Sequence, residues 1–240
     1  PPMGIEGVEH LAASQKLYFE TKDFSLQLYG IGFLMNSYDM VKDLYFSQTK
    51  DFTGGAKFSY HWKDFLTLHG TYHTDFYERY KRHERRDEDK KVYDAKIMQP
   101  SLRLTSQFFK KHDLILGIDY FQDDLTSDRF ASHRMLTRGL KEWEFFFQDT
   151  YSITPQWQVE AGLRTNYSLQ FGLMALPKVA VKYTPDEALA YRLNYAKGYR
   201  SPSIKELFFN WDHLGMFQII GNEMLQPEKN HYFSLGVEYA

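Results

Sequence analysis

Histidine side chains offer the first candidate chemistry in this 240-residue chain, because two of them share one face of a predicted strand. His69 and His73 lie four residues apart in an alternating segment, and His61 lies on the polar face of the segment before it. Imidazole is a common ligand of transition metals, so these side chains could bind a metal ion. They could equally be polar residues of a wet interior, and the spacing leaves both interpretations open.

The charged segment from Glu78 to Lys91 is a second candidate. It contains seven basic residues, Arg79, Lys81, Arg82, Arg85, Arg86, Lys90 and Lys91, and five acidic ones, Glu78, Glu84, Asp87, Glu88 and Asp89. Such a segment could bind an anionic metal chelate or the phosphates of lipopolysaccharide. Because both signs of charge are mixed, a solvated loop is the simpler prediction.

Composition and motifs exclude several classes of function. There is no cysteine, which removes disulfides, Cys-ligated metals and cysteine nucleophiles. Lys and Arg number 29 against 31 Asp and Glu, so no basic excess points to nucleic acid. We find no phosphate-binding glycine loop, zinc-protease helix or nucleophile elbow. The sequence therefore predicts neither an enzyme nor a nucleic-acid partner.

The elements that must position these residues are strands, because hydrophobicity repeats with a period of two over most of the chain. Leu66, Leu68 and Tyr72, for example, alternate with Thr67 and His69. Aromatic residues reach 18%, yet the mean hydropathy is -0.54. Strands with one aromatic face and one polar face explain both values.

The connections between the segments favour an antiparallel transmembrane β-barrel. Short turns near Lys63, Lys110, Pro155 and Pro185 alternate with longer polar segments at 77–91, 126–141 and 198–230, as in outer-membrane barrels. No apolar run reaches the roughly 18 residues of a membrane helix. Aromatic residues are expected at strand ends, where interfacial girdles lie, at Trp62, Phe65, Trp143, Trp157, Tyr183 and Tyr195.

About eleven strand-like segments of about 10 residues each are predicted. Eleven is an odd number and bacterial single-chain barrels use even ones, so we expect a piece of a larger barrel. One strand departs from the pattern, since alternation from Trp143 to Ile153 places Asp149 toward lipid. Either a bulge shifts the register there or Asp149 lies in the headgroup layer.

Two linked sequence boxes near the C-terminus are the most specific feature. The first runs from Gly198 through Tyr199, Arg200, Ser201 and Pro202 to Glu206 and Leu207; the second contains Gly221, Asn222, Leu225, Pro227 and Glu228. This region closely resembles the barrel of TonB-dependent outer-membrane receptors. On physical grounds we expect Gly198 to let the strand leave the sheet, Pro202 to cap it, and Arg200 to pair with Glu206.

The resemblance implies a bacterial outer-membrane receptor that imports a scarce metal chelate, such as heme, cobalamin or a ferric siderophore, driven by TonB. Residues 1–240 would form about half of a 22-stranded barrel, without plug domain, TonB box or C-terminal strand. The start has no signal peptide, so we expect a chain whose front has been removed. Implied partners are the TonB complex through the plug, outer-membrane lipid and lipopolysaccharide, and an extracellular capture protein. No integral cofactor is implied.

Heme is the ligand that the resemblance favours. Heme receptors of this family carry a histidine between the two boxes, and His213 occupies that place here as the tentative heme-iron ligand. Trp211, Met216 and Phe217 beside it would suit a porphyrin face, and Arg200 is a further tentative ligand contact. Two alternatives from other classes are a passive porin and a soluble β interaction module.

Overall fold

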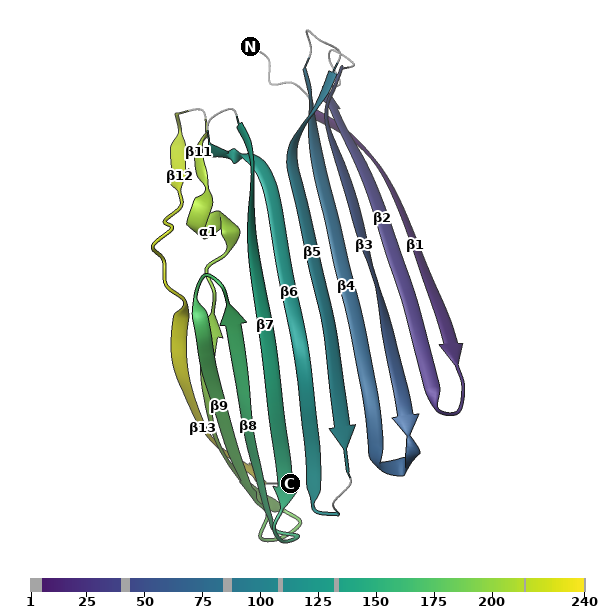
Figure 1. The fold of residues 1–240 in the computed structure, drawn as a ribbon, viewed down its shortest axis with the longest axis vertical. Coiled ribbons are helices and arrows are strands. Elements are labelled where there is room, and N and C mark those ends of the chain that lie inside the picture. Colours follow the sequence, from purple (N-terminus) through teal and green to yellow (C-terminus); the bar gives the residue numbers. More distant parts are fainter. Residues whose placement is uncertain are drawn as a thin grey trace.

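The computed structural model describes residues 6–39, 44–83, 88–107, 110–131, 134–213 and 215–239. It contains one antiparallel sheet of 11 strands in the order β1 to β10 and then β13 (Figure 1). The strands are β1 (Glu6–Glu20), β2 (Phe24–Asp39), β3 (Leu44–Trp62), β4 (Leu66–His83), β5 (Glu88–Ser106), β6 (His112–Ala131), β7 (Arg134–Ser152), β8 (Trp157–Ser168), β9 (Gly172–Tyr183), β10 (Leu189–Arg200) and β13 (Glu228–Tyr239). The all-β antiparallel prediction is confirmed.

Between β10 and β13 the chain leaves the sheet. It forms the short helix α1 (Ile204–Phe208) and a hairpin of β11 (Asn210–His213) and β12 (Phe217–Ile220), which lie together at one end of the sheet in Figure 1. We call this the loop end, and the opposite end, where β1, β3, β5, β7 and β9 turn into the next strand, the turn end. No helix in the described ranges has the length and apolar character needed to cross a membrane.

The strands are longer than the sequence predicted. Strands of the sheet have 12 to 20 residues, whereas about 9–11 residues suffice to span a bilayer. The predicted loops at 77–91 and 126–141 are mostly strand, so those two predictions are wrong in extent. Cross-strand contacts keep the polar residues in the sheet, including Lys91 Nζ to Glu78 Oε1 at 2.5 Å and Thr126 Oγ1 to Thr137 Oγ1 at 2.8 Å. Residues 84–87 of the charged segment lie outside the described part.

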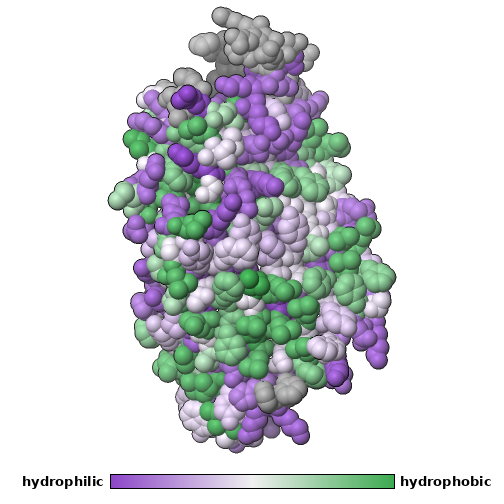
Figure 2. Space-filling view, viewed as in Figure 1, coloured by the Kyte–Doolittle hydropathy of each residue, from purple (hydrophilic) through white to green (hydrophobic). Residues whose placement is uncertain are grey.

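The two faces of the sheet differ in chemistry. On β7, Trp143, Phe145 and Phe147 are 44–51% exposed on one face, while Glu142 and Glu144 lie on the other. We call the aromatic face the lipid face and the charged face the lumenal face, because outer-membrane barrels alternate apolar and polar residues in this way. In Figure 2 hydrophobic side chains gather across the middle and lower part of the visible surface, and hydrophilic ones toward the loop end.

The register around Asp149 is regular, which excludes the bulge and leaves the headgroup layer of the two alternatives. Asp149 pairs with Leu114 on β6 and with Ala161 on β8, without a shift at that position. It lies on the lipid face near the turn end, where Nδ1 of His112 is 2.8 Å from its Oδ2 and the His112 ring stacks 4.4 Å from Tyr151. This polar and aromatic setting is typical of the interfacial layer.

Interfacial rings occur at the turn end as expected, although Trp143 and Tyr195 lie within strands and not at their ends. Trp157 on β8 stacks on Tyr183 of β9 at 4.3 Å. Trp143, in the middle of β7, contacts Tyr120 at 4.5 Å. Tyr151 lies eight positions after Trp143, about 26 Å along the strand, which is similar to the height of the apolar band of such barrels. The strands therefore continue past the membrane toward the loop end.

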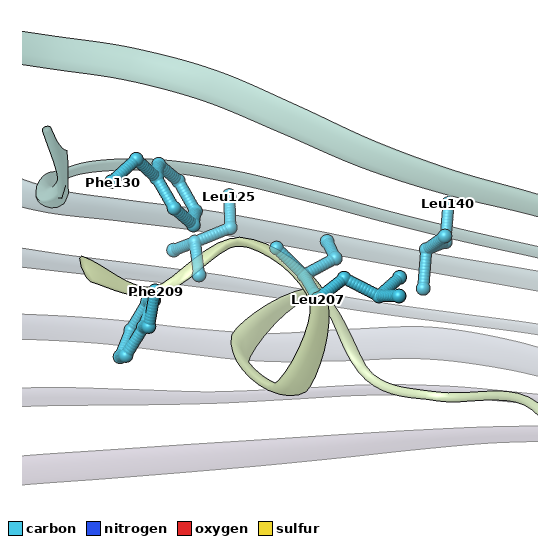
Figure 3. Packing of buried hydrophobic residues seen from close by; sticks show 6 residues of the cluster. Leu125, Phe130, Leu140, Leu207 and Phe209 are labelled. Atoms are coloured by element: carbon cyan, nitrogen blue, oxygen red, sulfur yellow. The ribbon is translucent and has the colours of Figure 1, made fainter. Parts of the chain in front are cut away.

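A small hydrophobic core lies where α1 covers the lumenal face. Ile204 and Leu207 of α1 are each 1% exposed, and they pack with Leu125, Phe130, Leu140 and Phe209. In Figure 3 the labelled side chains of the wall strands, Leu125, Phe130 and Leu140, lie on the side of the wall that faces Leu207 of α1. The segment 201–227, which we call the motif loop, is therefore packed against the wall and carries its residues into the lumen.

Candidate ligand-binding site on the lumenal face

Arg200 fastens both ends of the motif loop. Its guanidinium donates two hydrogen bonds of 3.2 Å to the carboxylate of Glu206 and two of 3.2 and 2.7 Å to that of Glu228. The predicted pair of Arg200 with Glu206 is confirmed, and Glu228 from the second box completes it. We call these three residues the Arg200 clamp. Their side chains are exposed, so the clamp acts mainly by fixing geometry.

Helix α1 starts with a capping box that shares the clamp's carboxylate. Ser203 Oγ accepts the Glu206 backbone N–H at 3.3 Å, and Glu206 Oε2 accepts the Ser203 backbone N–H at 2.7 Å. The hydrogen bonds from Arg200, and then those from Ser203, lower the pKa of Glu206 to about 2. Glu206 is therefore ionised across the whole neutral and mildly acidic range.

The glycines of the two boxes make room for neighbours. Gly198 remains in β10 opposite Asn230, so the prediction that it lets the strand leave the sheet is wrong; a Cβ there would collide with the Asn230 side chain. Gly221 lies against α1, where a Cβ would come within 2.6 Å of the Leu207 carbonyl carbon. Asn222 N–H donates to the Glu206 carbonyl at 2.9 Å, which joins the second box to the first.

The other box residues hold the loop in place. Pro202 is buried just after β10 ends, as predicted, and Pro227 is buried just before β13. Ser201 Oγ donates to Glu142 on β7 and lies 3.4 Å from the Tyr199 hydroxyl. Leu225 lies in a turn, its N–H donating to the Asn222 carbonyl at 3.2 Å. The boxes therefore position the motif loop.

A cavity of about 400 Å³ opens on the lumenal face beside this loop. Four cationic side chains and two acidic ones line it together with two tyrosines; they are Arg79, Lys81, Arg129, Lys205, Asp75, Asp128, Tyr77 and Tyr93. They come from β4, β5, β6 and α1. We call it the basic cavity, because its cations exceed its acids by two.

Aromatic rings hold the cations of the basic cavity in place. The Arg129 guanidinium lies 4.3 Å from the Trp211 ring, and Lys205 Nζ lies 6.0 Å from the Tyr93 ring. Tyr93 in turn contacts Tyr77 edge to face at 5.5 Å. Cation–π contacts of this kind orient a charge without neutralising it. The cavity can therefore bind an anion that also offers flat apolar surface.

Of the four residues predicted to contact heme between the two boxes, one reaches the basic cavity, two are exposed, and the side chain of the fourth is outside the described residues. Trp211, on β11, reaches the basic cavity through Arg129 and touches Phe217 of β12 edge to face at 6.0 Å. Met216 and Phe217 are 68% and 52% exposed. His213 ends β11, and its side chain lies outside the described residues. Its role as an iron ligand stays a prediction.

The three histidines of the opening prediction each make a hydrogen bond to a hydroxyl group on the lumenal face. Nδ1 of His61, His69 and His73 lies 3.0, 2.9 and 3.0 Å from Thr67, Ser59 and Tyr29 respectively. In the described ranges no group of three His, Cys, Asp or Glu side chains is arranged to hold a metal ion. These contacts favour the polar-wall interpretation.

Sequence reasoning missed most of the basic cavity. The mixed charges of the segment predict a solvated loop for Arg79 and Lys81, although alternation places both on one face of an extended β4. Lys205 is not among the predicted site residues, because the alternating pattern does not indicate the helix α1 that carries it. Its signal was present, since Ser203 with Glu206 three residues later is the capping-box pattern. Arg129 and Glu142 had no local signal, because only the sheet register brings them to the motif loop.

The fold and the lumenal site define a segment of an outer-membrane β-barrel. A family model described as TonB dependent receptor-like, beta-barrel matches residues 15–240, and the chain belongs to this family. Its barrels lie in the bacterial outer membrane, and its members are transport receptors. No curated protein sequence matches the chain significantly.

Solved siderophore receptors share the fold. A mutant of the ferric enterobactin receptor PfeA from Pseudomonas aeruginosa superposes with a TM-score of 0.76 at 15% identity, over 100% of this chain and 41% of that one. The siderophore receptor PirA from P. aeruginosa gives 0.75 at 17% identity, over 98% and 43%. PirA from Acinetobacter baumannii gives 0.72 at 14%, over 99% and 41%. The chain thus spans about two fifths of these receptors and forms a partial barrel.

Proposed function

We propose that this chain is the barrel segment of an active-transport receptor that takes up an anionic ferric chelate of the siderophore type. The basic cavity is the observation that carries the proposal, because it combines excess positive charge with tyrosine rings on the lumenal face. The similarity to siderophore receptors supports the same class of cargo.

The chemistry of ferric chelates matches this cavity. Iron(III) is a hard cation and is held by anionic oxygen donors, so a saturated complex with aromatic diolate donors is negatively charged. Guanidinium groups such as those of Arg79 and Arg129 bind anionic oxygens with strong, directional hydrogen bonds. Tyr77 and Tyr93 add flat surfaces for aromatic donor groups.

Heme import remains the alternative ligand within the same class. Its propionates would also suit a cationic site, but its iron needs an axial ligand such as His213. Cobalamin has neither the negative charge nor the aromatic donors that the cavity favours. The TonB complex, a plug domain and an extracellular capture protein are partners that this proposal includes.

Titration of the full-length receptor tests the cargo. We expect a ferric tris-catecholate to quench tryptophan fluorescence saturably, and the double variant Arg79→Gln/Arg129→Gln to weaken that binding at least about tenfold through lost charge-assisted hydrogen bonds. Lys50→Gln/Lys96→Gln is the matched control, because it removes two lysines whose ammonium groups lie over Tyr80 and Phe76 of the lipid face.

Two results would contradict the proposal. Equal loss of affinity in both double variants would show that the basic cavity is not the binding site. Tight binding of hemin with a Soret shift abolished by His213→Ala, and no binding of the ferric catecholate, would replace a siderophore-type cargo by heme.

A further inference from the structure

The basic cavity also contains negative charge, which a chelate with negative charge alone does not match. Asp75 on β4 and Asp128 on β6 line it together with the four cations. Opposite charges in one cavity attract each other. Even so, within the described ranges no ion pair of 4.0 Å or less joins these two acids to the cations. The cavity therefore presents charges of both signs to a ligand.

Asp75 lies at the end of the cavity that is nearer to the turn end, which we call the inner end. Along the lumenal face of β4 it is followed, at every second position, by Tyr77, Arg79 and Lys81. Asp75 and Lys81 are six positions apart, which corresponds to about 20 Å of strand. Because β4 runs from the turn end to the loop end, its acid lies at the inner end and its cations at the outer end.

Hydrogen bonds to β3 hold Asp75 and Arg79 apart. Thr53 is the register partner of Asp75, and its Oγ1 donates to Asp75 Oδ2 at 2.7 Å. Arg79 Nε donates to Ser47 Oγ at 3.4 Å, and Ser47 is the register partner of Lys81. The Arg79 side chain therefore extends toward the loop end, away from the Asp75 carboxylate.

Asp128 lies at the outer end and is separated from its neighbouring cation in another way. The register between β6 and β7 shifts between Ser127 and Ala131, so the consecutive residues Asp128 and Arg129 both line the cavity. The Arg129 guanidinium lies 4.3 Å from the Trp211 ring of β11. The Asp128 side chain makes no hydrogen bond or ion pair with another described residue. Its charge is therefore uncompensated by direct contacts in the described structure.

Two more lumenal carboxylates strengthen the negative charge at the inner end. Asp51 on β3 is a diagonal neighbour of Asp75, since it pairs with Tyr77. Asp123 on β6 shares a row with Asp75, because both pair with Ile97 on β5. Oδ1 of Asp51 is buried without a hydrogen-bond partner among the described residues. The inner end therefore attracts a positive charge.

The complement of such a cavity is a ligand with charges of both signs. Its anionic oxygens would bind the guanidinium and ammonium groups of the outer end. A protonated amine would bind Asp75, whereas a chelate without one would leave this carboxylate unpaired and would be repelled by it. A metal ion is a poorer complement, because no three His, Cys, Asp or Glu side chains in the described ranges are arranged to hold one.

We infer that the basic cavity selects ferric chelates that carry a protonated amine arm, and that Asp75 is the residue that recognises this arm. The inference rests on the proposed function, because it names the kind of chelate that the same cavity prefers. It gives a role to the acid at the inner end, which the binding of an anion alone does not explain.

A pair of matched chelates tests this inference on the full-length receptor. Both are ferric tris-catecholates on one scaffold with one side arm, which ends in a primary amine in the first chelate and in an acetylated amine in the second. The free amine is protonated at pH 7, so the amine chelate is less negative by one charge. Net attraction to the basic cavity would favour the acetylated chelate. Fluorescence titration should instead show that the wild type binds the amine chelate at least about tenfold more tightly.

Three variants locate this preference. Asp75→Asn keeps an oxygen that can accept from Thr53 and removes only the charge, so it should bring the two affinities within about twofold of each other. Asp128→Asn changes the net charge of the cavity by the same amount, and it should tighten the binding of both chelates and preserve their ratio. Asp119→Asn is the control, because Asp119 accepts from Ser101 on the lumenal face outside the basic cavity; it should change neither affinity by more than about twofold.

The outcomes separate this inference from the proposed function. Equal affinity of the wild type for the two chelates, or a preference for the acetylated one, would overturn the inference and leave the proposed function standing. A preference that is lost in Asp128→Asn but kept in Asp75→Asn would overturn the role of Asp75. Binding of neither chelate would overturn the proposed function and this inference together.

Discussion

The two halves of the lumenal wall are built from different interactions. On β2 to β4, histidines pair with hydroxyl groups, as His69 does with Ser59 at 2.9 Å. On β7 to β13, cross-strand ion pairs take their place, from Glu144 with Arg164 and Glu160 with Lys178 to Arg192 with Glu238 and the Arg200 clamp. Both halves satisfy the polar face of a sheet, but only the second carries a packed insertion, the motif loop, whose helix α1 lines the basic cavity together with β4, β5 and β6.

This difference distinguishes the parts of the sheet that only form the barrel wall from those that form the binding site. Hydroxyl–imidazole pairs are nearly neutral and local, so each affects little beyond its own strand pair. Charged groups held by two or three partners, such as Arg200 and Glu142, join segments far apart in the sequence. We therefore assign ligand selection to the basic cavity and the motif loop beside it, and a filling role to the hydroxyl–histidine pairs of β2 to β4.

The largest effect is expected from the core beneath α1. Leu207→Ala removes a side chain that is 1% exposed, and such truncations cost about 2–5 kcal/mol. Because this energy holds the motif loop on the wall, limited proteolysis should cut within 201–227 much faster than in wild type. Leu225→Ala, at a 37% exposed position in the same loop, is the control and should have little effect.

The Arg200 clamp comes next. Arg200→Ala should lower the affinity for the ferric chelate by about tenfold, since it frees both ends of the segment that carries Lys205. Arg192→Ala offers a close comparison, because Arg192 also lies on β10 and makes a bidentate pair with a glutamate of β13, Glu238. Isothermal titration should give Arg192→Ala an affinity for the ferric chelate close to that of the wild type. Equal losses of affinity in the two variants would show that the Arg200 clamp is no more important for binding than an ordinary ion pair of the barrel wall.

The clamp should also survive mild acid. A carboxyl whose pKa is lowered on folding contributes stability above its unfolded value and loses it as the pH falls toward the folded value, here about 2 for Glu206. A variant that retains Trp211 as its sole tryptophan should therefore keep its emission maximum from pH 7 to pH 5. The maximum should shift between about pH 4 and pH 2, and a transition near pH 6 would contradict the clamp geometry.

The smallest effects are expected on the histidine side. His69→Asn exchanges one hydrogen-bonding side chain for another, so stability should change by about 1 kcal/mol or less. Chelate affinity should stay within about twofold of wild type, as measured by the same titration. A loss of chelate affinity comparable to that of Arg200→Ala would show that the histidine pairs contribute to the binding site, which contradicts the account.

Sequence patterns predicted the sheet well because alternation and turn residues are local signals. The turn near Lys63 and the apolar face of β7 were correctly located, and so was the pair of Arg200 with Glu206. Strand length was not predictable from the same signals, since charged residues on β4 and β5 remain in the sheet through cross-strand pairs such as Glu78 with Lys91.

The basic cavity was harder to predict because distant strands contribute to it. Arg129 and Lys205 are 76 positions apart in the numbering and line the same cavity only because α1 folds back over β6 and β7. The family boxes drew attention to the motif loop itself, whereas the loop's partners on the wall, Glu142 among them, carry no motif. Register and packing, not local pattern, create the site.

The most direct test of this account is to locate the iron. A crystal structure of the full-length receptor soaked with the ferric tris-catecholate, with anomalous data at the iron edge, should place the iron peak in the cavity between Arg79, Arg129 and Lys205. A peak beside His213, or on the histidine side of the wall, would contradict the assignment of the basic cavity as the chelate site.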